Sequence, residues 1–238
     1  MVSDASLISG SLNFRDTGGL PAGDRVTRHG VLFRSGNLVN VDDTGLEALA
    51  GLGLRRIVDL RGDYEVRHAP SRVPEGIVTQ RVPLFAGSVD SFFVQGLTLR
   101  ELYAGIVEDS ADRVVEVVRA VIAEQPVLVH CTVGKDRTGV TVAMTLSAAG
   151  VDDDAVVNDY ARTEGMLPAE RNARVVSSIL RALPGATTAE ELATKSPAGV
   201  MRDLLGSLRE RYGAPVEYLR AHGLADDEIA ELRRVLLA

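Results

Sequence analysis

The stretch from residue 111 to residue 149 constrains the fold of this chain more than any other. Apolar residues recur at helical spacing over 111–124, Pro126 ends that pattern, and residues 127–129 form a short, fully apolar segment. A polar turn follows, and residues 138–149 are apolar enough for a buried helix. A helix, a buried strand and a second helix in this order are typical of an α/β unit in a mainly parallel sheet.

The rest of the chain extends this pattern. Short strands are predicted at three further places, residues 31–34, 56–60 and 78–84. Two helices are predicted before the central segment, over 43–52 and 99–107, and every later element is a helix, over 138–149, 152–164, 169–183, 204–212 and 226–237. The predicted fold class is α/β, with a mainly parallel central sheet flanked by helices and a helical C-terminal half. Because no segment resembles a linker, residues 1–238 are predicted to form a single domain.

Charge and composition exclude several classes of protein. The chain has 238 residues, of which 45% are hydrophobic and 25% charged, as in soluble globular proteins. Its net charge of −7 and the absence of a Lys/Arg-rich run argue against a nucleic acid partner. The longest uncharged run has 14 residues, too short to cross a bilayer, and the N-terminus lacks the basic region of a secretory signal. A cytoplasmic protein without a transmembrane segment is therefore expected.

The turn after the apolar strand is suited to binding a phosphate group. It reads His-Cys-Thr-Val-Gly-Lys-Asp-Arg-Thr-Gly over residues 130–139. Successive N–H groups of such a turn can point inward, and the start of the next helix adds its free N–H groups and positive dipole end. A planar guanidinium from Arg137 can grip two oxygens. The predicted phosphate-binding residues are Thr132, Val133, Gly134, Lys135, Asp136 and Arg137.

Cys131, the only cysteine of the chain, lies at the base of this turn and cannot form an internal disulfide. A thiol near a helix N-terminus and cationic groups is readily held as the thiolate. We therefore expect Cys131 to attack the phosphorus of a bound ester, giving a phosphocysteine that water hydrolyses. Thr138 is expected to donate its hydroxyl to this sulfur. His130 is expected to orient the loop and not to transfer protons.

The segment His-Cys-Thr-Val-Gly-Lys-Asp-Arg-Thr-Gly resembles the signature of the cysteine-dependent protein tyrosine phosphatases. More narrowly, it is similar to the atypical bacterial enzymes of the protein tyrosine phosphatase B type. Flanking matches spread over almost the whole chain, at residues 13–16 with 18–19, 32–35, 58–61, 158–160, 212–213 and 218–219. The resemblance implies a parallel-sheet phosphatase fold without a metal or other cofactor. Some relatives have a long helical lid, and the corresponding region here, residues 85–108, is shorter.

A general acid must protonate the leaving oxygen, and the sequence leaves three candidates. The resemblance suggests Asp136, which could instead merely pair with Lys135 or a neighbouring arginine. Asp59 is the second candidate because it ends a predicted strand, where sites of α/β proteins gather. Asp63 is the third. Lys135 is predicted to hold a second phosphate or a polyanionic head group, although it could also be a solvent-exposed partner of Asp136.

Other side chains could surround the site. Arg15, Arg34 and Arg61 could add positive charge, but more often such arginines pair with carboxylates, here Asp16, Asp59 or Glu65. Five aromatic residues could wall a cleft, although core packing is the commoner role for most of them: Tyr64, Phe85, Phe92, Phe93 and Tyr103.

The leading hypothesis is a protein-tyrosine-phosphatase, a phosphoric monoester hydrolase. The resemblance adds phosphoserine, phosphothreonine and phosphoinositides to its substrates. The expected partners are a phosphorylated protein or a phospholipid head group, with inorganic phosphate as product and a monomeric enzyme. Two alternatives stay open: a catalytically weak module of the same fold that only binds phosphorylated ligands, and a sulfurtransferase, against which the spacing from Cys131 to Arg137 argues.

Overall fold

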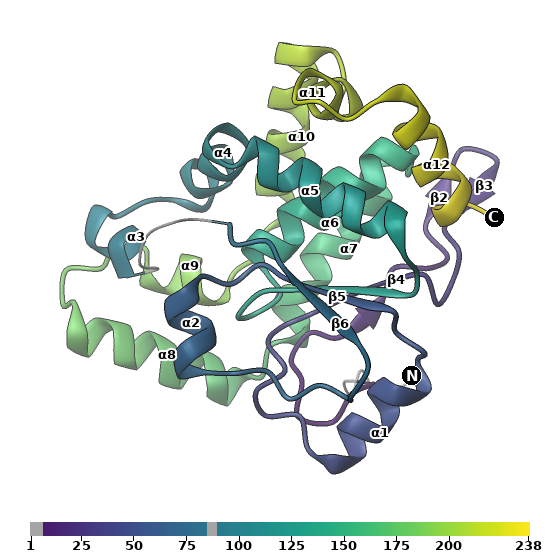
Figure 1. Cartoon of the computed structure of the whole chain (residues 1–238). Coiled ribbons are helices and arrows are strands. Elements are labelled where there is room, and N and C mark those ends of the chain that lie inside the picture. Colours follow the sequence, from purple (N-terminus) through teal and green to yellow (C-terminus); the bar gives the residue numbers. More distant parts are fainter. Residues whose placement is uncertain (1–6, 85–89) are drawn as a thin grey trace.

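A computed structural model describes residues 7–84 and 90–238 of the chain (Figure 1). Its central sheet has five strands in the order β1 (Arg15–Asp16), β4 (Leu32–Ser35), β7 (Val127–His130), β5 (Arg56–Asp59) and β6 (Val78–Arg81). β1 runs antiparallel to β4, and the other neighbouring pairs are parallel. β2 (Pro21–Ala22) and β3 (Arg25–Val26) form a separate antiparallel pair. The predicted α/β fold with a mainly parallel sheet is confirmed.

The inner strands are buried on both faces, which explains their continuous apolar sequences. Leu128 of β7 is in register with Phe33 and Ile57, and these side chains pack with Leu49 of α1 (Asp43–Gly51). The next register pair, Val58 and Val129, belongs to the larger core on the opposite face. Successive side chains of a strand point to opposite faces, so each strand contributes to both cores.

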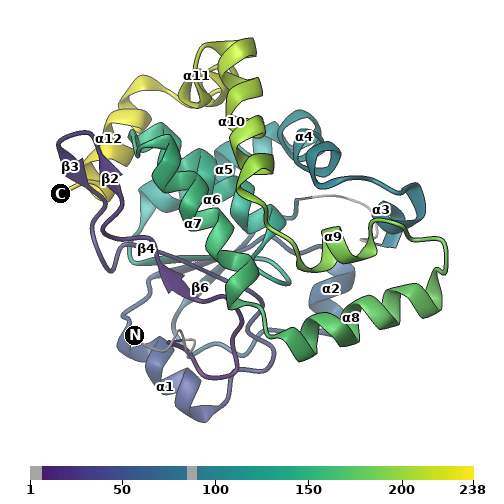
Figure 2. The same ribbon diagram turned by 180° about the vertical axis from the view of Figure 1, so that it is seen from behind.

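Helices cover the larger core in two shells (Figures 1 and 2). The inner helices are α4 (Leu99–Asp109), α5 (Ala111–Ala123), α6 (Asp136–Ala149) and α7 (Asp153–Met166), and the outer ones are α10 (Ala198–Tyr212), α11 (Pro215–Ala221) and α12 (Asp226–Leu236). α6 is the central helix, because it packs against α5, α7, α11 and α12 and all its residues except Asp136 and Ser147 are buried. The loop from β7 to α6 therefore starts at the middle strand and ends at the middle helix.

The remaining helices are short or peripheral: α2 (Asp63–His68), α3 (Asp90–Gln95), α8 (Ala169–Ala182) and α9 (Ala189–Thr194). Both views show them gathered at one end of the molecule (Figures 1 and 2). β5 is followed directly by α2, so this is the end at which the parallel strands β5 and β7 finish. Ligand sites of parallel sheets form at this edge.

Several elements differ from the sequence prediction. The strand predicted over 78–84 ends at Arg81, since Pro83 has no N–H for a regular ladder. The helix predicted from 204 begins at Ala198, where buried Val200 and Met201 anchor its first turn on the core. α2 was not predicted, because none of its residues is buried and it has no apolar stripe. None of the helices among the described residues is both long and apolar enough to span a membrane.

Candidate active site

The loop between β7 and α6, residues 131–135, forms a cradle. Cys131 follows β7 and is only 3% exposed, and its sulfur accepts a hydrogen bond from the Gly134 N–H at 3.3 Å. Gly134 has φ +73°, and a Cβ there would lie 2.3 Å from the Ser35 carbonyl oxygen. Only glycine permits both the backbone angle and this close approach to β4. The loop therefore curls back so that a backbone N–H points at the sulfur.

The carbonyl groups of this loop are bound from outside. Gly134 O accepts hydrogen bonds from Asn13 Nδ2 at 2.8 Å and Arg34 Nη2 at 3.0 Å. Thr132 O accepts from both the backbone and the side-chain nitrogen of Asn37, each at 3.0 Å. In a trans peptide the N–H of the next residue points away from the carbonyl. Outward carbonyls therefore turn the Val133 and Lys135 N–H groups inward, which is the geometry of an anion-binding nest.

Arg137 lies in the first turn of α6 and is held by Glu65 of α2. Its Nη1 donates to Glu65 Oε2 at 2.6 Å, and its Nη2 donates to Oε1 at 2.8 Å. Thr132 joins the pair, since its hydroxyl donates to Glu65 and accepts from Nη2 at 3.1 Å. Burial opposes ionisation of Glu65, but the hydrogen bonds and charge of Arg137 outweigh it and lower the pKa of Glu65 to about 2. Burial likewise disfavours the guanidinium, yet Glu65 and the Cys131 sulfur raise the pKa of Arg137.

Asp136 opens α6 next to this arginine. Its Oδ1 accepts hydrogen bonds from Lys135 Nζ at 2.6 Å and from the Tyr103 hydroxyl at 2.8 Å. Lys135 is fully buried and also donates to the Lys195 carbonyl at 2.8 Å. Lys135 was also considered as a solvent-exposed partner of Asp136. The two side chains do pair, but Lys135 is buried and not solvent-exposed.

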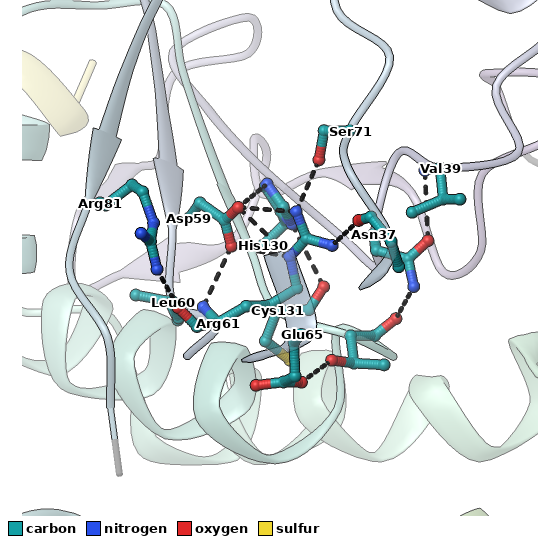
Figure 3. A network of polar contacts seen from close by, with 12 residues as sticks. Asn37, Val39, Asp59, Leu60, Arg61, Glu65, Ser71, Arg81, His130 and Cys131 are labelled. Atoms are coloured by element: carbon teal, nitrogen blue, oxygen red, sulfur yellow. Dashed lines mark hydrogen bonds and ion pairs between the residues drawn. The ribbon is translucent and has the colours of Figure 1, made fainter. Parts of the chain in front are cut away.

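Asp59 lies behind the cradle in a buried network (Figure 3). Its carboxylate accepts from Arg61 Nε at 2.9 Å and Nη2 at 2.7 Å, and its Oδ2 lies 3.8 Å from His130 Nε2. Burial raises the pKa of Asp59, but hydrogen bonds from Arg61 and the charge of its neighbours outweigh this and lower it. Burial also lowers the pKa of His130, whose Nδ1 lies 3.2 Å from the Cys131 carbonyl. Asp63 is further out, where it pairs with Arg81 at 2.8 Å.

Thr138 lies in the first turn of α6, in the sequence between Arg137 and Gly139. Its hydroxyl is buried and has no hydrogen-bond partner among the residues that the structure describes. An unpaired buried hydroxyl is uncommon and calls for an explanation. The hydrogen bond expected from this hydroxyl to the Cys131 sulfur is not formed between these two described residues.

Comparison with known proteins agrees with this geometry. A model of the tyrosine phosphatase family matches residues 7–238. The triple specificity protein phosphatase PtpB of Mycobacterium tuberculosis is 32% identical, over 97% of this chain and 98% of that protein. The chain belongs to the tyrosine phosphatase family. The resemblance inferred from the cysteine loop, to the protein tyrosine phosphatase B type, is confirmed.

More distant relatives of this tyrosine phosphatase are also found. A tyrosine-protein phosphatase of Nostoc commune is 28% identical, over 84% of this chain and 72% of that protein. The solved core catalytic domain of the PP-IP phosphatase Siw14 from S. cerevisiae matches with a TM-score of 0.40 and 15% identity, covering 84% of this chain and 94% of that one.

Two buried ion pairs of this tyrosine phosphatase were not predicted from the sequence. Arg15 and Arg34 were expected to pair with Asp16, Asp59 or Glu65, but both bind Asp159 of α7, each at 2.7 Å. The pairing of Arg61 with Asp59 was among those anticipated. Asp159 lies in segment 158–160, one of the segments that resemble the family. This resemblance drew attention to Asp159 but did not predict that it pairs with Arg15 and Arg34.

The aromatic residues proposed to wall a cleft differ in their burial. Tyr103 is buried against Asp136, whereas Tyr64 is 69% exposed and stacks on His68. Phe93 packs partly buried against the larger core. Phe85 and the side chain of Phe92 lie outside what the structure describes.

Proposed function

We propose that this phosphatase hydrolyses phosphomonoesters through a phosphocysteine on Cys131. One observation carries the proposal: the Cys131 sulfur accepts a hydrogen bond from the Gly134 N–H. In the same loop, the Thr132 and Gly134 carbonyl groups accept hydrogen bonds from residues outside the loop. In the first step the thiolate attacks phosphorus, the S–P bond forms and the P–O bond to the leaving group breaks. In the second step water attacks phosphorus and the S–P bond breaks, releasing inorganic phosphate.

Charge stabilisation in both steps is assigned to the loop N–H groups and Arg137. Glu65 engages one edge of the guanidinium, through Nη1 and Nη2. The other edge, with Nε and the second hydrogen of Nη2, is then directed to two phosphate oxygens. The Thr132 hydroxyl accepts a hydrogen bond from Nη2 on this second edge. When substrate binds, Nη2 is expected to donate to a phosphate oxygen in place of Thr132.

Asp136 is the proposed general acid. Its side chain is partly exposed at the start of α6, next to Arg137. Asp59 is less suited to the role, because both its oxygens accept hydrogen bonds from buried Arg61 and it is held as the carboxylate. Asp59 therefore acts by holding Arg61 and the strand end in place. Asp63 is directed to Arg81.

The substrates proposed are phosphotyrosine first, then phosphoserine, phosphothreonine and phosphoinositides. The breadth is supported by the name of the Mycobacterium tuberculosis relative, which is called a triple specificity phosphatase. We infer further that the enzyme is a cytoplasmic monomer built as one domain and that it needs no metal.

A panel of phosphotyrosine peptides, phosphoserine peptides and phosphoinositides tests the proposal. The wild-type enzyme is expected to release phosphate in the presence of a chelator, with the largest kcat/KM on phosphotyrosine. Cys131→Ser is expected to lose turnover while still binding inorganic phosphate in a calorimetric titration. Phosphate binding by the wild type without release of phosphate from any substrate would favour the alternative of a binding module.

A further inference from the structure

Tyr103 of α4 reaches the proposed acid from the protein interior. Its hydroxyl lies 2.8 Å from Asp136 Oδ1 and 2.8 Å from the Tyr160 hydroxyl, and the residue is 1% exposed. The two tyrosine rings meet edge to face, with centroids 5.9 Å apart and planes at 84°. This packing leaves the Tyr103 hydroxyl little freedom to move away from Asp136.

The two oxygens of Asp136 have different surroundings. Oδ1 accepts from Lys135 Nζ and from Tyr103, whereas Oδ2 has no hydrogen bond to any residue that the structure describes. A carboxylic acid carries its proton on one oxygen and can accept on the other. With Oδ1 occupied by two donors, the proton of Asp136 belongs on Oδ2.

The charged and titratable groups facing Asp136 come from four directions. Lys135 and Arg137 flank it in the sequence, Tyr103 and Tyr160 approach from α4 and α7, and Arg171 of α8 interacts with it electrostatically. The three cations surround Asp136 with positive charge, and a phosphate dianion bound in the cradle would add negative charge beside it. A neutral donor that binds Oδ1 without adding charge can orient the acid in either form.

We propose that Tyr103 is a positioning residue for the general acid, holding Asp136 through Oδ1 so that the proton on Oδ2 is directed at the leaving oxygen. This rests on the proposed function of Asp136. As the P–O bond breaks, that proton passes from Oδ2 to the leaving oxygen and Asp136 becomes a carboxylate. In the second step the carboxylate takes a proton from the attacking water, and Tyr103 keeps its own proton throughout.

The environment of Tyr103 suits a donor that is never ionised. Burial, followed by the negative charge of Asp136, raises the pKa of Tyr103 well above its ordinary value of 10. The phenol therefore stays protonated at neutral pH. Its donor role does not change with pH.

The test compares Tyr103→Phe with Asp136→Asn on two aryl phosphates. Phenyl phosphate has a poor leaving group that needs an acid, and 2,4-dinitrophenyl phosphate has a good one that does not. We use kcat/KM because it reports the step that breaks the P–O bond. Asp136→Asn is expected to lose about 10²–10⁴-fold on phenyl phosphate and much less on the dinitrophenyl ester. Tyr103→Phe is expected to lose about 10–10²-fold on phenyl phosphate, as for a misplaced catalytic group, and less than about threefold on the other ester.

Tyr218→Phe is the matched control. Tyr218 is 1% exposed, and its hydroxyl donates to the Val107 carbonyl of the same helix α4 at 2.7 Å. The variant removes a buried hydroxyl whose hydrogen bond is to Val107 of α4 and not to Asp136. It is expected to lower the midpoint of unfolding and to keep the wild-type ratio of kcat/KM between the two esters.

The outcomes separate this proposal from the assignment of the acid. If Asp136→Asn is selectively slow on phenyl phosphate but Tyr103→Phe keeps the wild-type ratio, the positioning role is overturned and the acid assignment stands. An equal loss on both esters in Tyr103→Phe also overturns it, because that pattern indicates a purely structural role. If Asp136→Asn itself keeps the ratio, the acid assignment falls and the positioning role falls with it.

A second variant covers the case in which Tyr103→Phe does not fold. Tyr160→Phe removes the hydroxyl that bonds to Tyr103 but leaves the contact of Tyr103 with Asp136 in place. A smaller loss of the same kind, selective for phenyl phosphate, supports the proposal. An unchanged ratio in Tyr160→Phe, with Tyr103→Phe unfolded, counts against it.

Discussion

The carboxylate of Glu65 binds both terminal nitrogens of Arg137, at 2.6 and 2.8 Å, across 72 residues of sequence. The pair ties α2, at the end of β5, to the start of α6, at the end of β7. The arginine is therefore oriented before any substrate arrives. Such preorganised donors stabilise charge without reorganisation during the reaction.

Glu65→Gln tests this orientation. An amide offers one acceptor oxygen and turns its NH₂ group toward the guanidinium, so Arg137 loses its two-point partner. We expect kcat/KM for p-nitrophenyl phosphate to fall about 10²-fold, as for a displaced catalytic group. Glu228→Gln, which breaks a two-point pair with Arg119 on the surface, is the control and should change kcat/KM less than about twofold. A higher kcat/KM in Glu65→Gln would show that Glu65 competes with phosphate.

The same pair predicts a pH dependence of stability. Arg137 lowers the pKa of Glu65 from 4.5 to about 2, so the folded state favours the carboxylate. Its contribution is complete above the unfolded pKa of 4.5 and is lost as the pH falls through about 2. The difference in unfolding free energy between wild type and Glu65→Gln should be constant from pH 8 to 5 and shrink below about pH 4.5. Urea titrations at each pH measure it, and a difference that does not shrink in acid would contradict the assignment.

Arg137→Ala removes the guanidinium and leaves Glu65 without its partner. We expect a loss of at least about 10²–10³ in kcat on p-nitrophenyl phosphate, the cost of a transition-state donor. Arg137→Lys should recover little of this, because an ammonium cannot bind two oxygens in one plane. Arg113→Ala, at an exposed position of α5, is the control. Activity of Arg137→Ala within tenfold of wild type would remove Arg137 from the mechanism.

Asp159 is expected to be needed mainly for stability. It lies buried between Arg15 and Arg34, and Arg34 in turn donates to Gly134 O of the cradle. Although burial opposes it, the charge of both arginines lowers the pKa of Asp159. Asp159→Asn should reduce the unfolding free energy by about 3–5 kcal/mol, because it leaves buried cations uncompensated.

The control for this change is Asp154→Asn, at an exposed pair with Arg202. It should change the unfolding free energy by less than about 0.5 kcal/mol. Chemical denaturation of both variants measures the difference. A loss below about 1 kcal/mol in Asp159→Asn would show that the arginines find other partners.

A single cysteine predicts how the enzyme responds to peroxide. Hydrogen peroxide converts the Cys131 thiolate to the sulfenate and is itself reduced to water. Since the chain has no second cysteine, no internal disulfide can form. Activity should be lost on treatment and return only with an added thiol, whether the sulfur stays a sulfenate or is trapped by a backbone nitrogen as a sulfenamide, because a thiol must also reduce the S–N bond. Mass spectrometry of the Cys131 peptide distinguishes the sulfenate, which adds one oxygen, from the sulfenamide, which loses two hydrogens. Inactivation that leaves this peptide unmodified would contradict the prediction.

Much of the cradle could be predicted from sequence because its parts are contiguous. Cys131, Gly134 and Arg137 follow one another between a strand and a helix, so their order and spacing could be read directly from the chain. The alternation of apolar and turn residues likewise predicted the parallel sheet. Short-range geometry needs only the local chain.

The partners of these residues were decided by the tertiary structure alone. Glu65, Tyr103 and Asp159 come from three different helices, and no spacing along the chain brings them to the cradle. The sequence left the acid open between Asp136, Asp59 and Asp63, and it gave no sign that Lys135 is fully buried. Charge pairing in the interior depends on which side chains the packed helices bring within about 3 Å, and only the assembled fold sets those distances.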